Sequence, residues 1–153
     1  MTNAWANTAP PSITDLIPHR PPMAFVTDLV RADADGALAR SVIGTDSLVA
    51  EPDGTVSPLA LLEIIAQACA AYGGWRTLAF GRRASAVLLV GVRAFDAVGR
   101  SRVGVPMEVA VTLTREFGGF HLFEGVLRQD GREIARADIK AFHPPQEAGE
   151  AGQ

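Results

Sequence analysis

The sequence predicts an α+β domain in which an antiparallel sheet curves around one long helix. The helix is expected in the stretch 57–74 (SPLALLEIIAQACAAYGG), which is rich in strong helix formers and apolar on nearly every face. Six stretches rich in β-branched residues surround it, two before and four after, and most of them are joined by short turns. Consecutive hairpins favour an antiparallel sheet. Because a helix that is apolar all round must be covered, we expect the sheet to wrap around it, which is the hot-dog arrangement.

Composition sets the broad class. The chain has 153 residues, enough for one domain, and its 48% hydrophobic and 20% charged content is typical of a globular protein. A net charge of −3 gives no reason to expect a nucleic acid as partner. We find no signal peptide and no stretch apolar enough for a membrane span, and therefore expect a cytoplasmic protein. The single cysteine excludes an internal disulfide, and the three separated histidines show no metal-ligand spacing, so no metal site is expected.

The expected domain occupies residues 12–143, between a flexible N-terminal arm at 1–11 and a disordered tail at 144–153. Ser12 is expected to cap one helical turn, which Pro18 stops. Two strands should follow and form a hairpin, at 23–31 and 37–43, with their turn at 33–36.

The central helix should start at Ser57 as its cap, with Pro58 in the first turn, where no N–H is needed. Gly73-Gly74 is one possible end, and a further turn through Phe80 is the other. Glu63 and Gln67 are its strongly polar residues, and because they are four apart they share one face. Two interpretations stay open: these groups simply find water or backbone partners, or the carboxylate is functional.

Four strands are expected after the helix. The first contains a glycine, Gly91, which suggests a bulge or a close approach by another backbone or a ligand. The next alternates cleanly, with Met107, Val109, Val111 and Leu113 on one face. Tight turns at Gly118-Gly119 and 129–131 should connect the last three. The expected bounds of the four strands are 84–95, 107–117, 120–128 and 132–142.

Three segments resemble the β-hydroxyacyl-acyl-carrier-protein dehydratases of fatty acid biosynthesis, a hot-dog family. These are residues 16–23 (LIPHRPPM), similar to that family's L-P-H-R-x-P entry, 62–67 (LEIIAQ), similar to its L-E-x-x-A-Q helix, and 89–92 (LVGV). Gly91 followed by Arg93, and the ending 137–142 (ADIKAF), look closer to a divergent branch associated with aryl polyene biosynthesis.

The resemblance implies a lyase that dehydrates 3-hydroxyacyl thioesters. In that family a histidine removes the α-proton, and a carboxylate from the partner subunit's helix protonates the leaving hydroxyl. The resemblance assigns the acid to Glu63 and a positioning amide to Gln67. The family's histidine lies in a loop before the helix, but residues 44–56 contain none. His19 is a candidate replacement base, although the resemblance gives its position a structural role, which we favour.

The resemblance also suggests residues that contact the substrate. The family's carbonyl-binding glycine falls on Pro58, which has no N–H, so Leu59 or a neighbour would have to replace it. The remaining substrate-binding candidates are Leu62, Gln67, Val90 and Gly91, although an ordinary core explains the apolar ones equally well. No cofactor is implied, because the acyl group would be carried on the phosphopantetheine of an acyl carrier protein or coenzyme A. Arg82 and Arg83 are candidates to meet an acidic carrier protein, and a solvated turn is the alternative.

Three functions remain, of which we favour the first. The chain is a dehydratase-like protein of fatty acid or polyene-type biosynthesis, as one half of a composite site completed by a related hot-dog subunit that carries the missing histidine. The second is a hot-dog acyl thioesterase in which Glu63 activates water. The third is a non-catalytic acyl-binding subunit. A homodimer or a heterodimer is expected, since hot-dog active sites lie at dimer interfaces.

Overall fold

The computed structural model describes residues 10–81 and 87–144, which form two helices and six strands. Helix α2 is long, at 22 residues, whereas α1 is a single turn. In chain order the elements are α1 (Ile13–Leu16), β1 (Val26–Ala32), β2 (Gly36–Ser41), α2 (Pro58–Ala79), β3 (Leu88–Ala97), β4 (Met107–Phe117), β5 (Phe120–Gln129) and β6 (Arg132–Phe142).

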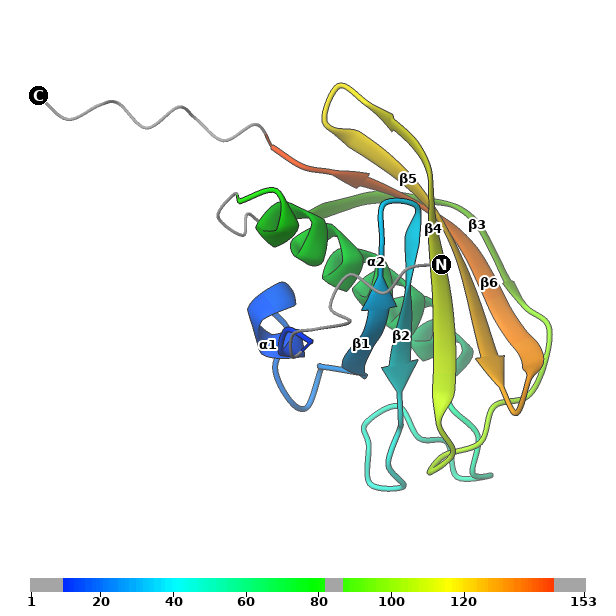
Figure 1. The fold of residues 1–153 in the computed structure, drawn as a ribbon. Coiled ribbons are helices and arrows are strands. Elements are labelled where there is room, and N and C mark those ends of the chain that lie inside the picture. Colours follow the sequence, from blue (N-terminus) through cyan, green and yellow to red (C-terminus); the bar gives the residue numbers. More distant parts are fainter. Residues whose placement is uncertain (1–9, 82–86, 145–153) are drawn as a thin grey trace, which may run out of the picture.

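The strands form one antiparallel sheet in the order β1-β2-β4-β5-β6-β3. Figure 1 shows this sheet curving around α2, with α1 beside the helix. The core lies between α2 and the sheet, and its largest fully buried side chains include Tyr72, Phe123 and Leu61. The α+β class and the antiparallel hot-dog arrangement expected from the sequence are therefore confirmed.

The strands follow the sequence pattern closely where it alternates. Both β4 and β6 have the expected bounds, and the expected inner face of β4 is buried at Met107, Val109 and Val111. In β3 the register shifts between Leu89 and Gly91, which confirms the expected bulge. Strand β1 starts three residues later than expected, because the backbone N–H groups before it bond elsewhere. The Met23 N–H donates to the Arg20 carbonyl, and the Phe25 N–H donates to Gln67.

The expected serine caps are wrong, because neither the Ser12 nor the Ser57 hydroxyl makes a capping bond. Instead the Ser57 carbonyl accepts the Ala60 and Leu61 N–H groups. Of the two expected helix ends, the later one is confirmed: the helix runs through Gly73-Gly74 to Ala79, with Phe80 as its C-cap. A Cβ on Gly74 would lie 2.4 Å from the Leu16 carbonyl oxygen, and one on Gly73 would lie 3.1 Å from a Val87 methyl. These glycines therefore serve close packing and not termination.

The Gly74→Ala variant is expected to be less stable than the wild type. Alanine favours a helix by about 1 kcal/mol over glycine, but the new methyl must push away the α1 backbone, and overpacking costs about 1–3 kcal/mol. Gly73→Ala is the matched control, because the Val87 methyl that it meets can move. Urea unfolding of both variants measures the difference. Equal stability of Gly74→Ala and wild type would contradict the close contact between α1 and α2.

Several expectations lie outside the described residues. They are the flexible arm (apart from residues 10 and 11), the tail beyond residue 144, the pair Arg82 and Arg83, and residues 84–86 of the strand expected at 84–95. Within residues 10–81 and 87–144, no helix is long and apolar enough to cross a membrane. In the same ranges, no three or more His, Cys, Asp or Glu side chains gather in a way that could hold a metal ion. The cytoplasmic location stays a prediction.

Candidate active site

The segment that follows α1 brings His19 to the face of α2. The Arg20 guanidinium holds this segment, since it donates hydrogen bonds to the carbonyls of Thr14, Ile17 and His19 at 2.8–3.0 Å. The sequence suggests an extended segment at the prolines that follow, but the chain turns there: the Pro21-Pro22 bond is cis, and the Arg20 carbonyl accepts the Met23 and Ala24 N–H groups. His19 is thus fixed by its own backbone surroundings before it meets the helix.

Gln67 joins α2 to the start of β1. Its side chain is buried, and its oxygen accepts the Phe25 N–H at 2.8 Å, with the Val26 N–H further away at 3.4 Å. Its nitrogen donates to the Met23 carbonyl at 2.8 Å and to Glu63 Oε1 at 2.9 Å. All of its hydrogen-bonding groups are therefore used, as a buried amide requires. The last of these bonds fixes the orientation of the Glu63 carboxylate.

The His19 and Glu63 side chains lie close together. The distance from His19 Nε2 to Glu63 Oε1 is 3.5 Å, and the two side chains are 33% and 37% exposed. Nδ1 of the same imidazole is buried and finds no hydrogen-bond partner in the part of the chain that the structure describes. A histidine beside a carboxylate can take a proton at one atom while the carboxyl group supplies one at another.

A small cavity of about 120 Å³ opens beside this pair. Cys69 is in its wall, and burial raises the pKa of its thiol, so the sulfur stays protonated and unreactive at neutral pH. The walls are mainly apolar, and strands β3 and β6 supply one side. The lining residues are His19, Glu63, Ala66, Gln67, Cys69, Ala70, Val87, Leu89, Ile139 and Ala141.

The structure brings together three of the residues singled out in the sequence, His19, Glu63 and Gln67. The five other candidates are not among the residues that line this cavity: Pro58, Leu59, Leu62, Val90 and Gly91. Leu59 is 75% exposed and Val90 is 49% exposed, so both lie on the surface of the single chain. Their contact with a substrate stays a prediction.

Sequence reasoning missed most of the cavity wall. Ala66 and Ala70 follow Glu63 at helical spacing, and Ile139 and Ala141 alternate on β6, so their faces were predictable. It also missed a second polar cluster, made by Arg76, Glu116 and His121. The signal was the Gly118-Gly119 turn, because a two-residue hairpin loop places Glu116 directly opposite His121.

The fold and the neighbouring His19 and Glu63 side chains define a hot-dog protein with a candidate site at its helix. A family model described as "ApeP-like: ApeP dehydratase" matches residues 11–152, so the chain belongs to the ApeP-like family. No curated protein matches the sequence significantly.

Solved structures show the same fold. The dehydratase heterocomplex ApeI:P from Xenorhabdus doucetiae matches with a TM-score of 0.79 and 20% identity over 89% of this chain and 93% of that chain. The Escherichia coli PaaI protein of the phenylacetic acid degradation operon matches at 0.63, with 10% identity over 76% and 82%. A hypothetical thioesterase from Streptococcus pneumoniae, solved with coenzyme A, matches at 0.61, with 7% identity over 75% and 83%.

Proposed function

We propose that the chain dehydrates 3-hydroxyacyl thioesters, with His19 as the base and Glu63 as the acid. The observation that carries this proposal is the 3.5 Å separation of the two side chains at the mouth of an apolar-walled cavity. This assigns His19 a role that the sequence favoured less. Membership of the ApeP-like dehydratase family supports the reaction class.

The proposed reaction moves one proton in each direction. His19 Nε2 removes the proton on the carbon next to the thioester carbonyl, and the electron pair forms the new double bond. The carbon–oxygen bond to the 3-hydroxyl breaks, and protonated Glu63 supplies the proton with which that hydroxyl leaves as water. His19 is then protonated and Glu63 ionised, and transfer across 3.5 Å restores the starting state.

The first turn of α2 supplies the third group of the proposed mechanism, a backbone N–H that binds the thioester carbonyl. Pro58 has no N–H, but the Leu59 N–H follows it in the first turn of α2, where backbone N–H groups have no partner within the helix. In the proposal, the Leu59 N–H polarises the thioester carbonyl, which the helix dipole favours at this end. No cofactor takes part, and the acyl group arrives on the phosphopantetheine of an acyl carrier protein or coenzyme A. The pathway is fatty acid or polyene-type biosynthesis.

A related hot-dog subunit is the proposed partner. Strand β3 is an edge of the sheet, and its apolar residues Leu88, Leu89, Val90 and Val92 are 40–52% exposed. An apolar edge strand with unpaired backbone groups is a surface that pairs with another chain. Since the similar ApeI:P structure is a heterocomplex, we favour a heterodimer over a homodimer. A histidine of the partner subunit would then be the base in place of His19, and Glu63 would remain the acid.

Thioester hydrolysis is the second candidate, because one similar structure is named as a thioesterase and holds coenzyme A. Glu63 would then activate a water molecule that attacks the thioester carbonyl. His19 would not be needed as a base in this reaction. This reaction releases a free thiol and forms no double bond. A non-catalytic acyl-binding subunit would do neither.

The test uses the purified chain, alone and with a histidine-bearing hot-dog subunit of the same pathway. Each sample receives a 3-hydroxyacyl thioester, and enoyl formation and thiol release are both followed. We expect enoyl product and no thiol. Thiol release would establish the thioesterase, and neither product from either sample would support acyl binding without chemistry. Activity that appears only with the added subunit would make the site composite.

A further inference from the structure

The backbone that leads into α2 is held by hydrogen bonds on both sides of the helix start. The Ser57 N–H donates to the Val49 carbonyl at 2.9 Å, and the Ser57 carbonyl accepts the Ala60 and Leu61 N–H groups. The Leu59 N–H lies between them and finds no acceptor in the part of the chain that the structure describes. This donor is therefore left for a substrate carbonyl, and its direction depends on how the residues just before the helix are fixed.

The residue before Ser57 is held by a side chain from a loop that is distant in the sequence. Ser101 Oγ accepts the Val56 N–H at 3.0 Å and donates to the Val56 carbonyl at 3.4 Å. Both residues are buried, so water has little access to this contact. Because a buried backbone N–H without a partner is costly, the Ser101 hydroxyl is needed where it lies.

Ser101 belongs to the loop 98–106 between β3 and β4, and this loop is itself fixed to the sheet. Gln129, the last residue of β5, is buried, and its side-chain oxygen accepts the Arg102 N–H at 2.8 Å. Its amide nitrogen donates to the carbonyls of Arg102 and Val105 at 2.9 and 3.0 Å. Both backbone groups of the residue next to Ser101 are therefore bound to a core strand, which gives the Ser101 hydroxyl a defined position.

The loop 98–106 also binds the segment before α2 through its backbone. The Val103 N–H donates to the Gly54 carbonyl at 3.0 Å, and the Gly104 N–H donates to the Ile43 carbonyl at 2.7 Å. These two bonds hold the segment further from the helix. Of the three contacts, the one made by Ser101 lies nearest in sequence to the first turn of α2.

We infer that Ser101 is a positioning residue for the proposed dehydration, which directs the Leu59 N–H at the thioester carbonyl by holding Val56. The inference rests on the proposed function and adds a residue to it. When the α-proton leaves, negative charge develops on the carbonyl oxygen, and a backbone N–H stabilises this charge well only if its direction is already set. Ser101 does not line the cavity beside Glu63, so it acts through the backbone and not on the substrate.

The first test is the turnover of the Ser101→Ala variant, assayed together with the histidine-bearing hot-dog subunit. We expect kcat for enoyl formation to fall about tenfold or more, since a misplacement of about 1 Å is enough for such a loss. KM should change less than about twofold, because the N–H acts mainly in the transition state. The variant is also less stable, since Val56 loses its partner, and the rates are therefore measured well below its melting temperature.

A second measurement reports on the carbonyl itself. Butyryl pantetheine, isotopically labelled at the thioester carbonyl, has no 3-hydroxyl group and cannot be dehydrated. Its carbonyl stretching frequency should fall when it binds to the wild type, because the carbonyl then accepts the Leu59 N–H. The fall should be smaller with Ser101→Ala. A role of Ser101 in folding alone would leave this frequency unchanged in the folded variant.

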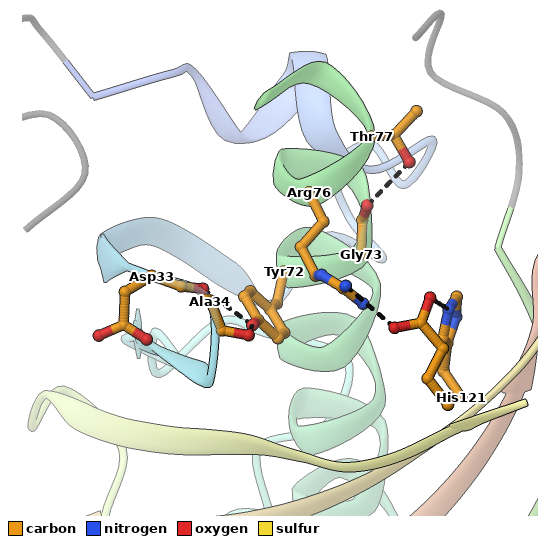
Figure 2. Close-up of polar contacts among 8 residues, drawn as sticks. Asp33, Ala34, Tyr72, Gly73, Arg76, Thr77 and His121 are labelled. Carbon is orange, nitrogen blue, oxygen red and sulfur yellow. Dashed lines mark hydrogen bonds and ion pairs between the residues drawn. The ribbon is translucent and has the colours of Figure 1, made fainter. Parts of the chain in front are cut away.

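Ser101→Cys is the second variant, for use if Ser101→Ala does not fold. The thiol fills the same place but is only a weak donor and acceptor, so we expect the same two losses. Thr77→Val is the matched control. Thr77 also carries a buried hydroxyl on α2, which donates to the Gly73 carbonyl at 3.0 Å near the other end of the helix (Figure 2). This control should keep the kcat and the carbonyl frequency of the wild type.

The outcomes separate the inference from the proposed function. Wild-type kcat in the Ser101 variants, or a carbonyl frequency that does not change on binding to an active wild type, would overturn the inference alone. An equal loss in Thr77→Val would do the same, because any buried hydroxyl of α2 would then matter as much. A wild type that forms no enoyl product would overturn the proposed function and the inference together.

Discussion

The Glu63→Gln variant is expected to lose at least about a hundredfold in the rate of enoyl formation while it keeps its fold. A general acid contributes about 10²–10⁴-fold, and an amide cannot replace it. The fold should survive because the new side chain has the same shape, and its oxygen can still accept the Gln67 hydrogen bond that now measures 2.9 Å. Steady-state kinetics and thermal unfolding of the same preparation measure both effects.

Glu51→Gln is the control for this variant, since Glu51 is an exposed carboxylate in the loop before the helix. It should behave as the wild type in both assays. If Glu63 were only a structural partner of Gln67, its substitution would lower the melting temperature and leave the turnover of the folded protein unchanged. That pattern would remove Glu63 from the reaction.

The fold was largely predictable because its signals are local. The alternation in β4, the glycine pair of its turn and the apolar run of α2 each depend on neighbouring residues, and each element appears where those signals place it. The end of α2 was less predictable. Gly74 looks like a helix terminator in isolation, and only the position of Leu16 shows that it is a contact between two helices.

The candidate site was likewise predictable only where its contacts are local. Glu63 and Gln67 share a helix face, so their contact follows from spacing alone. The contact between His19 and Glu63 joins residues 44 positions apart, and no local pattern predicts it. It depends on how α1 packs on α2 and on the carbonyls that Arg20 binds. The resemblance gave His19 a structural role because a motif records which residue is present and not which side chain it faces.

The His19→Ala variant tests that contact directly. We expect enoyl formation to fall by about 10²–10⁴-fold, the usual contribution of a general base. Imidazole added to the buffer should restore part of the activity, because the deletion leaves room for it beside a partly exposed carboxylate. A residue needed only for folding would not respond in this way. Glu63→Gln is the control, since imidazole does not replace the missing acid.

The two substitutions together decide where the base resides. If both abolish turnover and only His19→Ala is rescued, the acid and the base belong to this chain. If Glu63→Gln abolishes turnover but His19→Ala does not, the contact at 3.5 Å is structural and the base must come from the partner subunit. In that case activity should require the heterodimer, and the exposed apolar edge of β3 gives the physical reason to expect one. The result for His19 therefore also determines whether the catalytic unit is one chain or two.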